Sequence, residues 1–168
     1  MRRRPDDPTA MAGRLYDQHG ASLFRYALML LADRSAAEDA VQQVFASLMT
    51  LVARDAAPIE NAEHYLRRAV RNECYSALRR TVRREASIDA APTAALLQAI
   101  ATTDGTPDER IALERALRAL PAEQREVVHL RVYEGLTFQE IATQTGESIN
   151  TIASRHRYAL DKLRMLLQ

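Results

Sequence analysis

The chain has 168 residues, of which 47% are hydrophobic, and its 23 basic and 22 acidic residues give a formal net charge of +1. This length suits one large domain or two small ones. A single cysteine, Cys74, excludes an internal disulfide, and with four scattered histidines it gives no metal-ligand spacing, so we expect no metal.

The N-terminus has Asp6, Asp7 and Pro8 where a signal peptide needs an apolar segment. The longest apolar run, 26–32, is shorter than the about 20 residues that span a bilayer. We therefore expect no membrane insertion and a soluble protein of the reducing cytoplasmic compartment.

Two amphipathic helices are predicted next. The first covers 10–32, and a turn at 32–35 leads to the second, where Ser35 and Glu38 have capping-box spacing. Its helical spacing predicts a buried face of Ala37, Val41, Val44, Phe45, Leu48 and Leu51. Its outer face carries Asp39, Gln42, Gln43 and Ser47, to which spacing alone gives no role.

A third helix, 62–84, is strongly basic. Between Tyr65 and Arg84 there are seven arginines and one acid, Glu73. Like charges one turn apart destabilise a helix by about 0.2–0.5 kcal/mol per pair, so the cluster does not serve helix stability and favours a polyanionic partner. A solubilising face or a site for an acidic protein remain alternatives.

The arginines of this helix are interleaved with aromatic side chains. His64, Tyr65 and Tyr75 are suited to stacking on unpaired bases, worth about 1–3 kcal/mol per base. Cys74 keeps the spacing of the apolar face, which predicts a small core side chain. One stripe of the outer face holds Arg68, Asn72, Tyr75, Arg79 and Arg83, and beside it lie Arg67, Arg71, Arg80 and Arg84.

Composition changes after the basic helix. Residues 85–106 are rich in alanine and threonine, and their ionised residues are all acidic, which is typical of a flexible linker, with one helical turn near Leu96. This linker predicts an N-terminal helical domain at 10–84 and a C-terminal domain at 107–168. The fold class is therefore all-α, with two small domains.

The C-terminal domain is predicted to begin with a helix from Pro107 that ends at Leu120-Pro121. Pro121 suits the first position of the next helix, 122–134, which Gly135 stops. A helix-turn-helix follows: Thr137 and Glu140 form a capping box, Gly146 ends a short helix and Ser148 caps the last one.

The last helix has two distinct faces. Its inward stripe is predicted to be Ile149, Ile152, Ala153, His156, Leu160, Leu163 and Leu167, with His156 a core residue rather than a ligand. The opposite face carries Asn150, Thr151, Ser154, Arg155, Tyr158 and Lys162. Such a face is typical of a recognition helix in a DNA major groove, although helix-turn-helix geometry also occurs as simple packing.

Enzymatic chemistry is not indicated. The sequence has no glycine-rich phosphate loop, nucleophile elbow or prominent carboxylate pair. We therefore expect no catalytic residues, no cofactor and no small-molecule substrate.

Residues 15–166 resemble bacterial RNA polymerase sigma factors of the extracytoplasmic-function (ECF) group, within the sigma-70 family. The N-terminal match is carried by LYDQHGASLFRYALMLLADRSAAEDAVQQVF and YLRRAVRNECYSALRR. The C-terminal match is carried by ALRALPAEQREVVHLRVYEGLTFQEIATQTGESINTIASRHRYALDKLR. Two long motifs in the right order and spacing make the resemblance specific.

The resemblance implies roles for three surfaces. The second helix would bind core RNA polymerase through Glu38, Asp39, Gln42 and Gln43. The third helix would bind the minus-ten promoter element and hold melted DNA through His64, Tyr65, Arg68, Arg71, Asn72, Tyr75, Arg79, Arg80 and Arg83. The recognition helix would read the minus-thirty-five element through Asn150, Thr151, Ser154, Arg155, Arg157 and Tyr158.

The expected partners are thus core RNA polymerase and promoter DNA, while the sequence leaves open whether an anti-sigma factor also binds. The expected function is promoter recognition, DNA melting and transcription initiation. The alternative is a stand-alone helix-turn-helix regulator that binds duplex DNA without polymerase, commonly as a dimer on paired half-sites.

Overall fold

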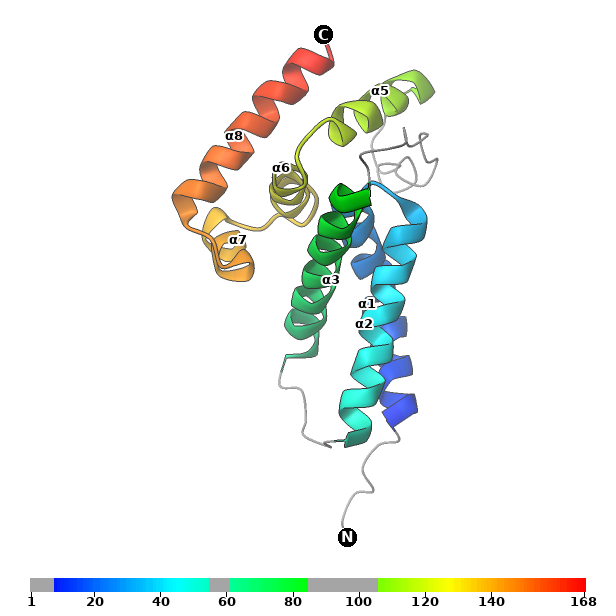
Figure 1. Cartoon of the computed structure of the whole chain (residues 1–168). Coiled ribbons are helices and arrows are strands. Elements are labelled where there is room, and N and C mark those ends of the chain that lie inside the picture. Colours follow the sequence, from blue (N-terminus) through cyan, green and yellow to red (C-terminus); the bar gives the residue numbers. More distant parts are fainter. Residues whose placement is uncertain (1–7, 55–60, 85–105) are drawn as a thin grey trace.

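In the computed structural model, the described residues are 8–54, 61–84 and 106–168, and every regular element among them is a helix (Figure 1). The N-terminal part comprises α1 (Pro8–Leu31), α2 (Arg34–Arg54) and α3 (Ala62–Arg84). The C-terminal part comprises α5 (Pro107–Arg118), α6 (Ala122–Val128), η1 (His129–Tyr133), α7 (Phe138–Thr145) and α8 (Ile149–Leu166). The predicted linker, including its turn near Leu96, lies outside the described residues except for Thr106.

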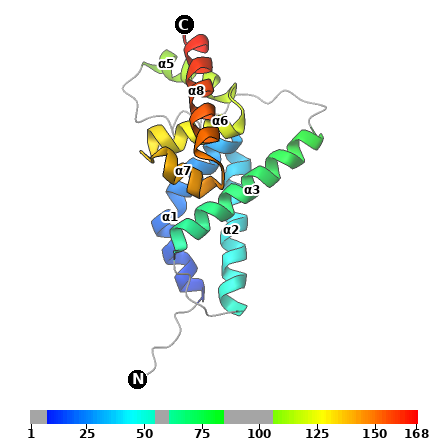
Figure 2. The same cartoon turned by 90° about the vertical axis from the view of Figure 1, so that its left-hand side faces the viewer.

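Helices α1, α2 and α3 pack into a bundle, with α3 crossing the other two (Figure 2). Leu48, Leu66 and Cys74 are fully buried in its core, as their helical spacing predicts. The prediction for Leu51 was wrong, because its side chain is 44% exposed. Val52, four residues after Leu48, takes the inward position instead, in keeping with the period of the helix.

The start of α2 also differs from the prediction. Asp33, rather than Ser35, caps the helix: its Oδ1 accepts a 2.8 Å hydrogen bond from the backbone N–H of Ala36. Because α2 already begins at Arg34, the Glu38 carboxylate lies one turn further on and accepts from the Arg34 guanidinium at 2.8 Å. The predicted Ser35–Glu38 capping box is therefore wrong.

The helix-turn-helix of α7 and α8 forms as the sequence predicts. Thr137 and Glu140 make a reciprocal capping box, Gly146 ends α7 with φ of 75°, and the Ser148 hydroxyl accepts from the backbone N–H of Thr151. Of the predicted inward stripe of α8, Ile152 and Leu163 are buried, whereas Ala153, His156 and Leu160 are only partly buried. The prediction was wrong at the two ends, where Ile149 and Leu167 are 44% and 47% exposed. Both lie at a terminus of the helix, whose packing partners cover Ile152, Ala159 and Leu163.

The predicted helix 122–134 is only partly α-helical. It changes at His129 into the π-helix η1, in which the Glu134 backbone N–H donates to the His129 carbonyl five residues earlier at 3.1 Å. Pro121 stands one position before α6 as its N-cap, not inside the helix. The extra residue in the turn changes which side chains of 129–134 face the rest of the molecule.

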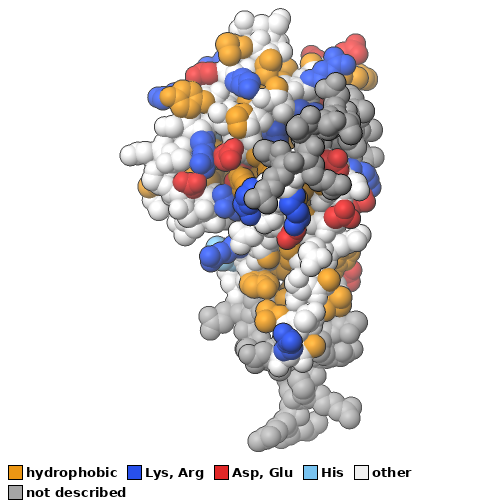
Figure 3. Space-filling model, in the orientation of Figure 1, with side chains coloured by type: hydrophobic (Ala, Val, Ile, Leu, Met, Phe, Trp, Pro, Cys, Tyr) orange, Lys and Arg blue, Asp and Glu red, His pale blue; other side chains and the backbone are white. Residues whose placement is uncertain are grey.

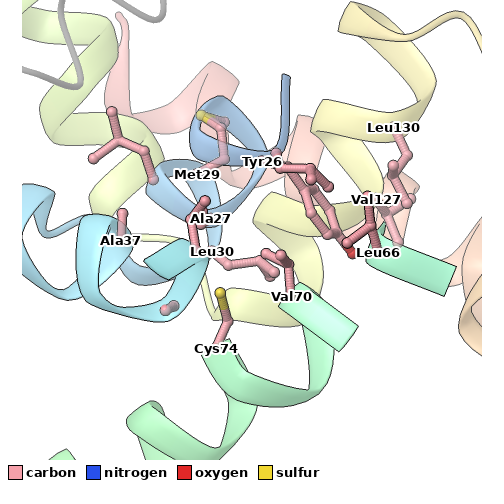
Figure 4. Packing of buried hydrophobic residues seen from close by; sticks show 14 of the residues in the cluster. Tyr26, Ala27, Met29, Leu30, Ala37, Leu66, Val70, Cys74, Val127 and Leu130 are labelled. Carbon is pink, nitrogen blue, oxygen red and sulfur yellow. The ribbon is translucent and has the colours of Figure 1, made fainter. Parts of the chain in front are cut away.

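The N-terminal and C-terminal parts pack against each other. Helix α6 lies on α1, and Val127 and Leu130 meet Tyr26 and Leu66 in one continuous apolar core (Figure 4). Tyr26, Leu66 and Leu130 are each at most 1% exposed. The described residues thus confirm the all-α fold class with a C-terminal helix-turn-helix, and they join its two halves through α6.

Candidate nucleic-acid interface

The predicted DNA-binding face of α3 is only partly accessible. Its exposed members are His64, Tyr65, Arg68, Asn72, Arg79 and Arg80. Arg79 donates to the Ser76 hydroxyl at 2.8 Å, and Arg80 pairs with Glu73 at 2.8 Å while remaining 66% exposed. The Arg83 side chain lies outside the described side chains. These groups form a basic surface that a phosphate backbone could reach, although Arg80 would have to share or leave its ion pair with Glu73.

Two predicted members of this face, Arg71 and Tyr75, already form hydrogen bonds with another residue of the chain. Both contact the carboxylate of Glu126, a residue of α6 whose side chain is 1% exposed. Arg71 donates to its two oxygens at 2.7 and 3.2 Å, and the Tyr75 hydroxyl donates to Oε2 at 2.8 Å. The hydroxyl of the buried Tyr26 donates to Oε1. One carboxylate therefore binds a guanidinium and two phenols.

The electrostatics of this cluster follow from burial and from the Glu126 charge. Burial, with the nearby carboxylate, raises the pKa of both Tyr26 and Tyr75 well above the usual value for a phenol. Burial by itself would lower the pKa of Arg71, but its hydrogen bonds and ion pair with Glu126 outweigh burial and raise it. The tyrosines are thus held as hydrogen-bond donors and Arg71 as a cation.

A second polar cluster lies beside the first. Arg67 of α3 forms an ion pair with Glu134, which also contacts the His129 ring nitrogen Nε2 at 3.2 Å. The His129 ring stacks on Tyr133, with centroids 5.0 Å apart, and lies 5.8 Å from that of Tyr26. The π turn brings His129 and Glu134 together toward α3.

Arg125 anchors the same side of α6 to α1. Its guanidinium, on a residue that is 7% exposed, donates to the carbonyls of Met29 and Leu30 at 2.9 and 2.7 Å, at the C-terminal end of α1. It also donates to Leu120 within the C-terminal part at 2.6 Å. Burial lowers the pKa of Arg125, but the negative end of the α1 dipole and these carbonyls favour its charged form.

The predicted DNA-binding face of the recognition helix α8 is partly exposed to solvent. Asn150, Arg157 and Tyr158 are exposed, with the Arg157 guanidinium 5.1 Å from the centre of the Tyr158 ring. The other predicted members, Thr151, Ser154 and Arg155, are partly buried. The Thr151 and Ser148 hydroxyls share a hydrogen bond, and Arg155 forms an ion pair with Glu147 at 3.1 Å.

Lys162, predicted on the same polar face, has another role. Its ammonium donates a 2.6 Å hydrogen bond to the carbonyl of Ala119. Ala119 is the residue that caps the C-terminus of α5. Lys162 therefore joins α8 to α5, and the face available to DNA lies in the first half of α8.

Part of the predicted DNA face of α3 and Arg155 of α8 line a common groove of about 350 Å³. Its walls are Arg71, Asn72, Tyr75, Ser76 and Arg79 of α3, Glu123 of α6, and Glu147 and Arg155 before and within α8. On the face of the molecule in Figure 3, basic and acidic side chains lie close together in the middle, rather than forming an all-basic surface.

The predicted polymerase-binding residues lie on the outer side of α2. Asp39, Gln42 and Gln43 are exposed, and the Glu38 side chain is 44% exposed. Asp39 and Gln43 also face a shallow groove between α2 and α3. A protein partner could reach all four side chains, although Glu38 would have to share or leave its ion pair with Arg34.

Sequence reasoning missed the residues that join the halves of the molecule. Glu126 and Glu134 were not singled out, and Arg67 was placed only on the basic face. A signal was present for Glu126, since it lies next to Val127 and one turn before Leu130, on the apolar side of a predicted helix, where an acid needs a partner. Its partners 51 to 100 residues away gave no local signal.

Other kinds of site are not evident in the part of the chain that the structure describes. It holds no group of three or more His, Cys, Asp or Glu side chains placed to bind a metal. None of its helices has the length and apolar character needed to span a membrane. Cys74 is buried, and burial raises its thiol pKa to about 12, so this side chain is unreactive core.

Two family models match the chain: Sigma-70 region 2 at residues 15–84 and Sigma-70, region 4 at residues 116–165. The ECF RNA polymerase sigma factor SigL of Mycobacterium tuberculosis is 33% identical over 95% of this chain and 90% of its own length. The ECF RNA polymerase sigma factor SigK of Mycobacterium bovis is 27% identical over 99% of this chain and 91% of its own.

A solved structure is similar in fold. The sigma factor RpoE from Bartonella quintana, in complex with the anti-sigma factor NepR, superposes with a TM-score of 0.65 and 26% identity, covering 92% of this chain and 95% of that one. Matches to both halves disfavour a stand-alone helix-turn-helix regulator, which would need only the second. The chain therefore belongs to the ECF group of RNA polymerase sigma factors.

Proposed function

We propose that this sigma factor divides its work among three helices: α2 binds core RNA polymerase, α3 binds the melted minus-ten element and α8 reads the minus-thirty-five element. The observation that carries the proposal is the combination of an exposed arginine and aromatic face on α3 with an open recognition helix in the same chain. Residues 10–84 would act as one functional domain and 107–168 as the other, with 85–106 as the linker.

On the minus-ten side, the arginines would hold phosphates and the aromatic groups would hold unpaired bases. Arg68, Arg79 and Arg80 are exposed cations on one helix, which supports salt-dependent backbone binding. Tyr65, at 37% exposure, presents a ring on which a base can stack. Arg71 and Tyr75 would join this surface only after they leave Glu126.

On the minus-thirty-five side, the first turns of α8 would enter the major groove. Asn150, Arg157 and Tyr158 are exposed there and offer amide, guanidinium and phenol groups for base edges and phosphates. Arg155 would gain access by leaving Glu147. This arrangement matches a recognition helix that reads bases from its N-terminal half.

The chain would supply no catalysis of its own, because initiation chemistry belongs to the polymerase that it recruits. It would act in the cytoplasm, where core polymerase and the chromosome are found. The RpoE structure with NepR supports an anti-sigma factor as a third partner.

Transcription in a purified system tests the proposal. Core polymerase with the chain should give promoter-specific transcripts from a pool of genomic templates, and core alone should not. Equal transcript profiles with and without the chain would reject the proposed function. Mapped start sites would identify the two promoter elements.

The minus-ten assignment is tested by changing Arg79→Ala and Arg80→Ala together. We expect weaker promoter opening and a salt dependence whose slope falls by about one unit for each arginine that no longer neutralises a phosphate, measured as open-complex formation against salt concentration. Arg54→Ala with Arg115→Ala, two exposed arginines away from α3, is the charge-matched control. Unaltered opening across salt concentrations would contradict the assignment.

A further inference from the structure

The turn before the recognition helix carries an acidic residue, Glu147, for which no role was predicted from the sequence. Glu147 lies one position before Ser148, the N-cap of α8. Its Oε1 forms an ion pair at 3.1 Å with Nη2 of Arg155, which is eight residues further along the chain. The Glu147 and Arg155 side chains are 36% and 24% exposed, and both line the groove of about 350 Å³. An acid therefore stands beside one of the residues predicted to read the minus-thirty-five element.

The stability of α8 gives little reason for an acid at this position. The Ser148 hydroxyl already caps the helix by accepting from the backbone N–H of Thr151. An ion pair that is partly open to solvent adds little to stability. Near DNA, by contrast, the Glu147 carboxylate is repelled by the phosphate backbone. It therefore weakens binding to DNA unless a base supplies a hydrogen bond in return.

The choice of such bases is narrow. In the major groove, a carboxylate can accept hydrogen bonds only from the amino groups of cytosine and adenine. Guanine O6 and thymine O4 are acceptors that repel it, and adenine places the acceptor N7 beside its amino group. Cytosine N4 is therefore the best base partner for Glu147. The Arg155 guanidinium only donates, and its preferred base is guanine, through O6 and N7.

One C·G base pair presents these two groups side by side. Cytosine N4 donates to guanine O6 within the pair, at the usual N–H···O distance of about 2.9 Å. The carboxylate oxygen of Glu147 and the nitrogen of Arg155 are 3.1 Å apart, which is almost the same spacing. The two side chains can thus exchange their ion pair for contacts with the two bases of one pair, and neither charge is left without a partner.

We propose that Glu147 is a specificity-determining residue, which accepts from cytosine N4 of a C·G base pair in the minus-thirty-five element while Arg155 donates to the guanine of that pair. The inference rests on the proposed role of α8 in reading this element. It adds that the Glu147 carboxylate acts mainly by exclusion, because it repels base pairs that place an acceptor opposite it.

Base preferences of the polymerase complex test this assignment. The template is one that wild-type chain with core polymerase transcribes, and its upstream element is changed one base pair at a time. Glu147→Gln keeps the shape of the side chain and removes its charge. At one C·G pair, wild type should discriminate against other base pairs about tenfold more strongly than Glu147→Gln, as expected for one charged hydrogen bond. Because glutamine also donates, the variant should tolerate adenine there.

Two further variants define the comparison. Arg155→Ala should lose discrimination at the same base pair, because Arg155 is assigned to its guanine. Asp161→Asn is the charge-matched control, since it removes a negative charge from an exposed carboxylate of α8 whose ion pair is with Arg164. It should keep the wild-type preference at every position.

N4-methylcytosine at the identified pair separates a base contact from an effect through Arg155. The methyl group replaces the N4 hydrogen that faces the major groove and leaves the hydrogen that pairs with guanine. Wild type should transcribe the methylated template about tenfold less than the unmodified one, from the loss of one charged hydrogen bond. Glu147→Ala, which has no carboxylate, should transcribe both templates equally.

Equal effects of N4-methylation on wild type and Glu147→Ala would overturn the inference, because Glu147 would then only orient Arg155. Identical base preferences of Glu147→Gln and Asp161→Asn at every position would also overturn it. Failure of the proposed function gives a different result: transcription by the wild type would not depend on the sequence of the upstream element at all.

Discussion

Among single residues, the carboxylates of the C-terminal part differ in the part of the molecule that they stabilise. Glu140, in a capping box, is exposed and serves its own helix through Thr137. Glu126 and Glu134 are largely removed from water and serve residues of α3. An unpaired carboxylate at either position would be costly, so the partner arginines and phenols are part of what allows the chain to close.

Glu134 predicts a pH dependence. Burial alone would raise its pKa, but the His129 and Arg67 contacts outweigh burial and hold the pKa below the ordinary value of 4.5. A carboxyl group with a lowered pKa in the folded state stabilises the fold fully above its unfolded pKa. That stabilisation disappears as the pH falls from about 4.5 through the lower folded value.

Glu134→Gln should therefore lower the free energy of unfolding by about 1.5–3 kcal/mol at pH 7, the range for a charged hydrogen bond. The difference from wild type should shrink as the pH is lowered below 4.5. Chemical denaturation at a series of pH values measures it. A difference that stays constant down to pH 3 (roughly one unit below a normal Glu pKa) would show that the charge is not the source of the effect.

Among the secondary-structure elements, helix boundaries are set mainly by short-range chemistry. The capping box at Thr137, the left-handed Gly146 and the Ser148 cap fix the turn between α7 and α8. The exception is the start of α2, where two candidate caps compete. There Asp33, which directly follows Ala32 with its φ of 53°, caps α2 instead of Ser35.

The two glycines Gly146 and Gly13 should respond oppositely to alanine. Gly146→Ala should cost about 1 kcal/mol, because an L-residue is strained at φ of 75° although the space around its Cβ is empty. Gly13→Ala, within α1 and also unhindered, should gain about 0.5–1 kcal/mol from helix propensity.

Thermal and urea unfolding of both variants test this pair. The Gly13 variant is the control for a general effect of replacing glycine by alanine. Stabilisation by Gly146→Ala would mean that the turn does not require the left-handed conformation.

In the whole molecule, the shared apolar core couples the stability of the N-terminal part to that of the C-terminal part. Val127 is 1% exposed and lies beside Tyr26 and Leu66, so α6 belongs to the packing of both parts (Figure 4). Arg125 adds hydrogen bonds from α6 to the end of α1. From this coupling we expect the N-terminal and C-terminal parts to unfold together as one cooperative unit.

The expected result is a single unfolding transition in urea, with amides of α2 and α8 losing hydrogen-exchange protection at the same denaturant concentration. Val127→Ala should lower the stability of both helices by about 2 kcal/mol, from the buried carbons that it removes. Val132→Ala, at a position that is 67% exposed, should lower neither. Separate transitions for α2 and α8 would contradict the coupling.

The helices, their order and the helix-turn-helix could all be predicted from the sequence, because caps, glycines and helical periodicity act over a few residues. The same periodicity placed Tyr65, Arg79, Arg80 and Asn150 on faces that the structure leaves exposed. Their roles in binding DNA stay predictions, as do those of Glu38 and Gln42 in binding polymerase.

Which members of those faces are accessible depends on tertiary packing. Arg71 and Tyr75 share the spacing of their exposed neighbours, and nothing local distinguishes them, yet a carboxylate about 50 residues further along the chain occupies both. The π turn at His129 likewise rotates Glu134 toward Arg67, which a helical period of about 3.6 does not predict. Pairing of buried charges depends on where distant helices meet, and that is fixed by the packing of α6 on α1 and α3.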